Sequence, residues 1–203
     1  MPRFIEASVA FLLILLTLPL QLLSLLVSTL FIGFPPLYLS KRVGKNGTPY
    51  THYKIRSMKK GKETGRVFFE QKRLNYCGKL LRKLHLDELP ELYLILTGKM
   101  SFVGPRPLPQ KLLENLSTEI RQTVKPGWTG PAQLWLLKHG SLNKRLQIKL
   151  DNHYVNKRNL LYDLRVITAT LTGVPGAKPV NMDPKGSPDR VIFRKNNNER
   201  QNQ

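Results

Sequence analysis

The sequence predicts an α+β protein that is mainly helical, in which an N-terminal membrane-inserted helix precedes a compact cytoplasmic domain. Three observations predict this class. Residues 7–40 carry no charged side chain, the segments after them alternate between strand-like and helix-like patterns, and the 203-residue chain is long enough for one ordinary domain beyond the apolar run. The domain is expected to hold a small β-hairpin and amphipathic interfacial helices.

The apolar run predicts a helix that enters a bilayer. About 20 residues suffice for one straight crossing, so residues 7–40 exceed the requirement. Pro19 lies near the middle and predicts a kink, which favours a re-entrant helix that returns to the same face. The alternative is one tilted span, with Lys41 and Arg42 on the cytoplasmic side. A signal peptide is disfavoured, because its apolar region is only about 7 to 15 residues.

The charge balance points to an anionic partner. The chain has 33 Lys plus Arg against 13 Asp plus Glu, a net charge of +20. Lipid headgroups, a phosphorylated ligand or nucleic acid all fit this charge, and no nucleic-acid motif accompanies it. Cys77 is the only cysteine, which excludes an intramolecular disulfide and a cysteine metal cluster and predicts a small packing residue.

The first elements after the apolar run are predicted to form a hairpin. Residues 37–43 and 50–56 are rich in β-branched and aromatic side chains, and residues 44–47 between them contain two glycines. Residues 66–83 then predict one or two helical pieces with a break near Gly78.

Four further helices follow from apolar spacing and from Pro and Gly signals. They are expected from Leu86 to Thr97, and over residues 108–124, 142–155 and 160–171. The predicted organisation is a membrane helix, a compact domain and a polar tail, over residues 1–40, 41–175 and 176–203.

Two loops rich in proline and glycine interrupt this pattern, at residues 103–107 and 125–131. Prolines on both sides of Arg106 stiffen the backbone and hold that side chain out. The loops predict either a ligand cradle or plain connections. Lys125 and Trp128 are candidates in the second loop, where the indole either stacks on a ligand or lies at the lipid interface.

Asp87 and Glu88 are adjacent carboxylates at a predicted helix start. Consecutive helical side chains diverge by roughly 100°, so the pair has two separate roles. One carboxylate can attack phosphorus while the other binds Mg²⁺; the alternative is that both only favour the helix start. The candidate phosphate-binding cations are Lys54, Arg56, Arg82 and Arg106. The histidines, expected to be helix caps or surface residues, are His52, His85, His139 and His153.

Several motifs occur in one order along the chain. They read KRVGKNG at residues 41–47, YKIRSM at 53–58, LDELPEL at 86–92, MSFVGPRP at 100–107 and KPGWTG at 125–130. This order resembles the bacterial sugar transferase family, the small monotopic polyprenyl-phosphate phosphoglycosyl transferases. The resemblance covers residues 7–171.

The resemblance implies transfer of a sugar 1-phosphate from a UDP-sugar to polyprenyl (undecaprenyl) phosphate, with Mg²⁺ and release of UMP. This is the first membrane step of bacterial glycan assembly (capsule, exopolysaccharide, O-antigen or glycoprotein), at the cytoplasmic face of the inner membrane. Asp87 matches the nucleophile that forms a covalent phosphosugar intermediate, and Glu88 matches the Mg²⁺ ligand. Lys54 or Arg56, Arg82 and Arg106 match phosphate-binding positions. Asp151 and Asp163 match late acidic positions.

The chain departs from the family pattern at a few positions. Leu18 replaces the serine that often precedes the proline of the re-entrant helix, and residues 133–137 lack an expected arginine. The rival hypothesis is a non-catalytic membrane adaptor that binds anionic lipid or a phosphorylated partner. Such an adaptor has no need for the pair Asp87 and Glu88. A homo-oligomer stays open, as does the identity of the sugar.

Overall fold

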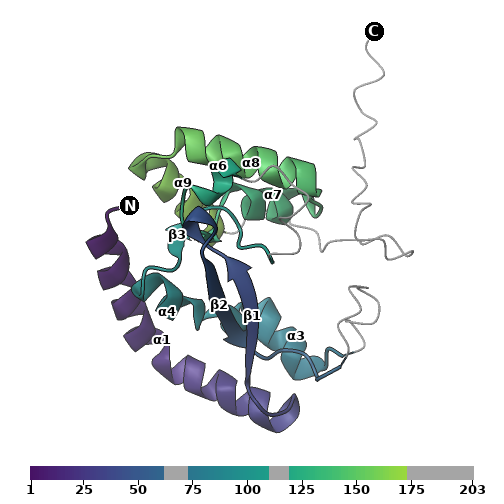
Figure 1. Cartoon of the computed structure of the whole chain (residues 1–203). Helices are drawn as coiled ribbons and strands as arrows, with labels where there is room; N and C mark the ends of the chain where they lie inside the picture. The colour runs from purple at the N-terminus through teal and green to yellow at the C-terminus, as the bar shows by residue number, and fades with distance from the viewer. Residues whose placement is uncertain (62–72, 110–118, 173–203) are drawn as a thin grey trace.

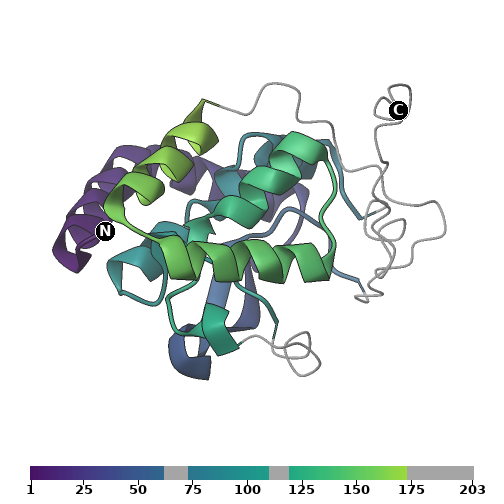
Figure 2. The same ribbon diagram turned by 90° about the horizontal axis from the view of Figure 1, so that it is seen from above.

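The computed structural model describes residues 1–61, 73–109 and 119–172. In Figure 1, helix α1 (Arg3–Phe31) curves along one side of the molecule and a β-hairpin crosses its middle. Figure 2 shows the last three helices gathered in one layer: α7 (Pro131–His139), α8 (Lys144–Lys157) and α9 (Leu160–Leu171). The predicted tail, residues 176–203, lies outside the described residues.

Helix α1 turns its small and polar side chains toward the protein. Its buried residues recur at helical spacing and are Glu6, Ala10, Ile14, Gln21, Ser24 and Ser28. Large apolar side chains cover the opposite face, among them Leu12, Leu16 and Leu30, each more than 60% exposed. Among the described residues, α1 is the one helix long and apolar enough to cross a membrane.

Pro19 lies inside α1 without ending it. The helix continues to Phe31, and the rest of the apolar run enters the first strand. The curvature of α1 in Figure 1 agrees with a proline that bends the helix. The sequence pattern did not predict that the helix ends at Phe31.

The predicted hairpin is confirmed. Strands β1 (Leu37–Val43) and β2 (Pro49–Ile55) pair antiparallel, with Leu37 opposite Ile55 and Val43 opposite Pro49. A 3-10 turn, η1 (Lys45–Gly47), connects them, with Asn46 in the left-handed region at φ 54°. The second strand ends one residue before Arg56, which therefore lies outside the sheet.

A parallel strand pair at the two proline loops was not predicted, with one strand leading into the first loop and the other lying within the second. β3 (Ser101–Val103) pairs with β4 (Gly127–Thr129), so that Ser101 lies opposite Gly127. Three-residue strands are too short to show an alternating pattern, so sequence reasoning identified only the loops around them. The pairing joins the Arg106 loop to the Lys125 loop.

The glycine at the centre of this pairing has no room for a side chain. A Cβ at Gly127 would lie 2.0 Å from the backbone nitrogen of Gly104. We therefore expect Gly127→Ala to lower the free energy of unfolding by ~1–3 kcal/mol, the usual cost of overpacking. Thermal unfolding in detergent measures this, with Gly61→Ala as a control, because the nearest atom to a Cβ built there is Nε of the flexible Arg73 side chain at 3.0 Å. An unchanged midpoint for Gly127→Ala would contradict the close approach.

Gly78 does not break a helix, contrary to the prediction. It lies in the first turn of α3 (Tyr76–Lys83), which begins after the N-cap Asn75. A Cβ at Gly78 would lie 2.0 Å from the carbonyl oxygen of Ser57, so the glycine permits α3 to pack closely against the segment after β2. The earlier part of the predicted helical stretch, residues 66–72, lies outside the described residues.

The later helices agree with the sequence apart from α7. α8 and α9 confirm the last two predicted helices, and the N-cap asparagines Asn143 and Asn159 accept hydrogen bonds from Leu146 and Tyr162. α7 was missed because its apolar residues are consecutive rather than periodic. Of the predicted helix 108–124, residues 110–118 lie outside the described part, and α6 (Glu119–Gln122) is helical.

The main core lies where α1 meets the short helix α4 (Glu91–Leu96), next to the β3–β4 pair. Its fully buried side chains include Leu92, Leu94, Ile95 and Met100. Tyr154 of α8 and Val166 of α9 complete this core from the opposite side. The packing fixes the N-terminal end of α4, and hence the acidic pair that precedes it.

Candidate active site

The acidic pair lies in a 3-10 turn, η2 (Leu86–Glu88), between α3 and α4. The prediction of one helix from Leu86 is corrected here, because α4 begins only at Glu91, after Pro90. His85 precedes the turn in the left-handed region at φ 54° and redirects the chain out of α3. The two carboxylates therefore project from a tight turn beside β2.

Asp87 is the more buried of the two carboxylates. The residue is 7% exposed, and among the described residues its side chain forms no ion pair. Burial, together with the neighbouring charge of Glu88, raises the pKa of Asp87 to about 6, while Lys54 and Arg82 oppose the increase. Asp87 is thus an ionisable carboxylate that has little contact with solvent and, among the described residues, no ion pair that would neutralise its charge.

Glu88 has the opposite environment. Lys54 Nζ lies 2.5 Å from Glu88 Oε1 and 3.0 Å from Glu91 Oε1. Burial alone would raise the pKa of Glu88, but contact with His85 and the charge of Lys54 hold it below its usual range. The pKa values of the two adjacent carboxylates are therefore shifted in opposite directions.

Two of the remaining predicted cations take different places. Arg82 donates from Nε to Ser57 Oγ at 2.8 Å. Its positive charge lowers the pKa of Asp87, against the larger effect of burial. Arg56 donates from Nε to the Pro35 carbonyl at 2.6 Å, which directs its guanidinium toward the segment that follows α1. The structure brings Lys54 and Arg82 to the acidic pair, and it does not bring Arg56 there.

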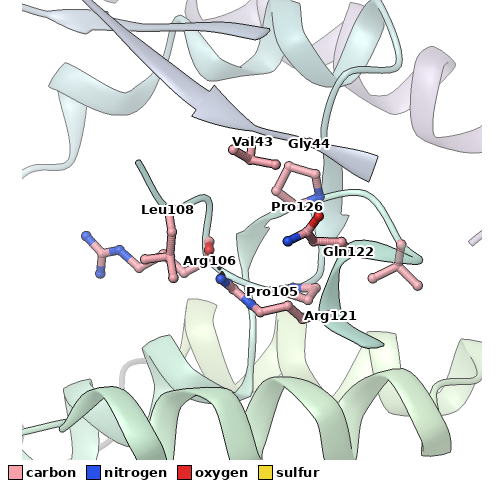
Figure 3. Close-up of a pocket in the computed structure, with 9 residues that line it drawn as sticks. Val43, Gly44, Pro105, Arg106, Leu108, Arg121, Gln122 and Pro126 are labelled. Carbon is pink, nitrogen blue, oxygen red and sulfur yellow. Dashed lines mark hydrogen bonds between the residues drawn. The ribbon is translucent and has the colours of Figure 1, made fainter. Parts of the chain in front are cut away.

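A buried ion pair supports the loop that carries Arg106. Arg121 Nη2 lies 2.9 Å from Asp151 Oδ2 and donates to the Arg106 carbonyl at 2.5 Å. Figure 3 shows Arg121 and Arg106 among the residues that line a cavity of only about 10 Å³, too small for a ligand. Burial raises the pKa of Asp151 to about 7, against the opposing charge of Arg121. Asp151 therefore has a structural position, outside the acidic site.

The Arg106 side chain itself extends away from that small cavity (Figure 3). Its positive charge lowers the pKa of both Glu88 and Asp151, which places the guanidinium within electrostatic range of each. The charge of Arg106 thus acts on the acidic pair, while its backbone carbonyl accepts a hydrogen bond from Arg121.

The other candidates lie away from the acidic pair. Asp163 accepts a hydrogen bond from the Tyr154 hydroxyl at 2.7 Å and pairs with the Met1 amino group at 2.9 Å. Trp128 packs on Phe102, with ring centroids 6.2 Å apart, and belongs to the edge of the core. Lys125 lines a separate hollow near the start of α1.

Sequence reasoning missed two buried residues of the site. His52 is 3% exposed and its Nε2 lies 3.3 Å from Glu91 Oε1, which corrects the prediction of a surface histidine. His52 and Lys54 are two residues apart in β2 and therefore lie on the same face of the strand. Glu91 is the first residue of α4. The two-residue spacing in the strand could have placed His52 on the same face as Lys54. The contacts of both with Glu91 depend on tertiary packing, which the sequence pattern does not show.

The site fits Mg²⁺ as a partly hydrated ion. Among the described residues, no three His, Cys, Asp or Glu side chains form a preformed metal site. Mg²⁺ keeps several waters and commonly takes one or two carboxylates plus substrate phosphates, so a full protein cage is not required. Lys54 contacts Oε1 of Glu88, and His85 Nδ1 lies 3.8 Å from Oε2. A carboxylate oxygen is the kind of hard ligand that Mg²⁺ takes, so Glu88 could contribute one such oxygen.

A mainly helical fold with one long apolar helix, and an acidic pair near the charges of Lys54, Arg82 and Arg106, agrees with the class of small sugar transferases that the sequence resembles. A family model described as "Bacterial sugar transferase" matches residues 1–176. The chain belongs to the bacterial sugar transferase family.

Curated relatives cover most of the chain. An uncharacterized sugar transferase, EpsL, of Bacillus subtilis is 35% identical over 85% of this chain and 86% of its own length. The exopolysaccharide production protein ExoY of Sinorhizobium fredii is 30% identical over 85% of this chain and 84% of its own. A UDP-glucose:undecaprenyl-phosphate glucose-1-phosphate transferase of Caulobacter vibrioides is 32% identical over 83% of this chain and 67% of its own.

Proposed function

We propose that this protein transfers a sugar 1-phosphate from a UDP-sugar to undecaprenyl phosphate and releases UMP. The observation that carries the proposal is the divided acidic pair, in which Asp87 is buried without an ion pair and Glu88 is held ionised by Lys54. Family membership and the similarity to a named glucose-1-phosphate transferase support the same reaction class.

In the proposed reaction, an Asp87 carboxylate oxygen attacks the β-phosphorus of the donor. The bond between that phosphorus and the bridging oxygen breaks, and UMP leaves with the oxygen. An oxygen of undecaprenyl phosphate then attacks the same phosphorus, which frees the Asp87 carboxylate and yields the lipid diphosphate sugar. No general base is needed for the first step, because an ionised carboxylate is itself the nucleophile.

The surrounding residues would bind and orient the phosphates. Arg82 and Arg106 provide positive charge near the acidic pair, and Lys54 keeps Glu88 ionised. Glu88 and the donor phosphates would hold Mg²⁺, which when bound offsets charge developing on the transferred phosphate. Buried Glu91 pairs with Lys54, and buried His52 contacts Glu91.

An assay of UMP release tests the proposed function. Protein in detergent with Mg²⁺, undecaprenyl phosphate and a panel of UDP-sugars is expected to release UMP with at least one donor. Chelation of Mg²⁺ by EDTA should reduce the rate by about 100-fold or more, since metal charge is a large part of phosphoryl-transfer catalysis. Binding of lipid without UMP release from any donor would favour the adaptor hypothesis instead.

We further propose that α1 is re-entrant and places the site at the cytoplasmic face of the bacterial inner membrane. Two contacts at opposite ends of the helix support this. Arg3 donates to the Ile95 carbonyl at 2.8 Å, and Ser28 Oγ donates to the Arg56 carbonyl at 2.7 Å. A span across a hydrocarbon core of about 30 Å would carry one end away from the domain.

Cysteine labelling tests this topology. In a Cys77→Ser background, Pro2→Cys is expected to resist a membrane-impermeant maleimide in intact cells and to react after permeabilisation. Lys149→Cys, on an exposed position of α8, is the matched control for the cytoplasmic domain. Labelling of Pro2→Cys from the periplasm would show that α1 spans the membrane.

A further inference from the structure

A second hollow lies near the start of α1, lined by residues of α1, β3, α8 and α9. Its volume is about 340 Å³, within the range of about 300 to 1,000 Å³ of small-molecule sites. The charged side chains that line it are Arg3, Glu6, Lys45, Lys125, Arg158 and Asp163. Four of these are cations, so the hollow has an excess of positive charge.

The two carboxylates in this lining are already engaged. Glu6 accepts a hydrogen bond from Ser101 Oγ, and Asp163 accepts one from the Tyr154 hydroxyl. By contrast, neither Lys45, Lys125 nor Arg158 forms an ion pair within the described part of the chain. The cations therefore remain available to an anion that enters the hollow.

These cations also repel one another. Burial lowers the pKa of Lys125, and the nearby charges of Arg3 and Lys45 lower it further, with only Glu6 opposing them. Like charges around a concave surface cost free energy that a bound anion would offset. A phosphate group matches this environment, because it accepts several charge-assisted hydrogen bonds at once.

Exposed apolar side chains lie among the lining residues or next to them in the sequence. Phe4 of α1 is 72% exposed, and Leu160 and Leu161 of α9 are 52% and 58% exposed. Leu160 itself lines the hollow. A free inorganic anion would gain nothing from contact with these apolar side chains. A lipid can place its phosphate among the cations and its acyl chains against the apolar side chains.

The hollow is separate from the candidate active site. Arg3 is fixed at the C-terminal end of α4 through the carbonyls of Ile95 and Leu96. Asp87 and Glu88 lie in the turn that precedes the N-terminal end of the same helix. None of the residues placed around the acidic pair lines the hollow.

We propose that this hollow binds the phosphate headgroup of an anionic membrane phospholipid and so holds the N-terminal end of α1 at the membrane surface. Lys45, Lys125 and Arg158 contact the phosphate, and Phe4 and Leu160 contact the acyl chains. The inference goes beyond the proposed transferase reaction and is tested without it.

Native mass spectrometry of the full chain in detergent measures this binding directly. Phosphatidylglycerol is expected to bind wild-type protein at least about tenfold more tightly than the Lys125→Glu variant, because each cation beside an anionic headgroup contributes appreciably. Lys149→Glu makes the same charge change on an exposed part of α8 and is expected to bind like the wild type. Zwitterionic phosphatidylcholine should not distinguish the three proteins.

Competition separates the two sources of a phosphate. Inorganic phosphate at the same concentration is expected to leave the bound phosphatidylglycerol in place; displacement would assign the hollow to free phosphate and overturn the lipid proposal. Equal lipid affinity of wild type and Lys125→Glu would overturn it as well. If Lys125→Glu does not fold, Arg158→Gln replaces it, with the same expected loss. UMP release is not a readout, so failure here is distinguishable from failure of the transferase proposal.

Discussion

Replacement of Asp87 by asparagine is expected to reduce UMP release by at least ~10³-fold, because loss of a covalent nucleophile removes the pathway and leaves only residual binding effects. Asparagine keeps the size of the side chain and removes its negative charge, so the donor site should keep its shape. The measurement is the rate of UMP release at saturating Mg²⁺, donor and undecaprenyl phosphate. Donor binding in the absence of the acceptor is the control.

The same variant is expected to fold at least as well as the wild type. Turnover of Asp87→Asn at an undiminished rate would show that another group attacks the phosphorus. Loss of both turnover and folding would be inconsistent with the buried, unpaired position of this carboxylate.

The difference in stability between Asp87→Asn and the wild type should depend on pH in a defined direction when metal is removed with EDTA, because only the wild type carries the Asp87 carboxyl. The folded pKa of Asp87, about 6, exceeds the value of 3.8 expected for an exposed aspartate. Its contribution to stability is therefore fully present below pH 3.8 and is lost as pH rises through 6. At pH 7 the variant should be more stable than the wild type by ~1–3 kcal/mol. Thermal midpoints from pH 4 to pH 8 measure the difference, and a constant difference would contradict the pKa increase.

Replacement of Asp151 by alanine is expected to lower the free energy of unfolding by ~3–5 kcal/mol, the cost of leaving a buried charge uncompensated. Arg121 is 5% exposed and would lose its partner at 2.9 Å. Denaturant unfolding in detergent measures the effect. Lys149→Ala removes a charge from an exposed position of the same helix, α8, and is expected to change stability by less than ~0.5 kcal/mol.

A double replacement separates stability from positioning. Arg121→Met with Asp151→Leu removes both charges and should recover much of the lost stability, because hydrophobic replacements of buried ion pairs are often neutral. UMP release should stay reduced, since the Arg106 carbonyl no longer receives the Arg121 hydrogen bond. Full activity in the stable double variant would show that the ion pair does not position the Arg106 loop.

The local elements that the sequence predicted well are those with a clear period or turn signal. The hairpin over β1 and β2 has alternating strands around a glycine turn, and α9 has apolar residues at helical spacing with an asparagine cap. The elements that were missed have neither signal. β3 and β4 have three residues each and form only because distant segments meet, and α7 has an unbroken apolar run.

The candidate site divides in the same way. Asp87 and Glu88 were identified from their adjacency and their motif, and Lys54 and Arg82 were correctly placed with them. Arg56 and Asp151 matched the family pattern equally well, yet the first binds the backbone after α1 and the second supports the Arg106 loop. A motif records which residues recur and says nothing of the direction in which a side chain points.

The family, the long apolar helix and the pair of carboxylates follow from the sequence alone, because each is expressed in the order and type of neighbouring residues. The tertiary structure alone decided which cations lie near that pair and that Glu91 contacts both Lys54 and His52. It also decided that burial raises the pKa of Asp87. The physical reason is that burial and electrostatic potential depend on contacts between residues distant in sequence. Neither quantity is local, and both determine how the pKa values of the two carboxylates differ.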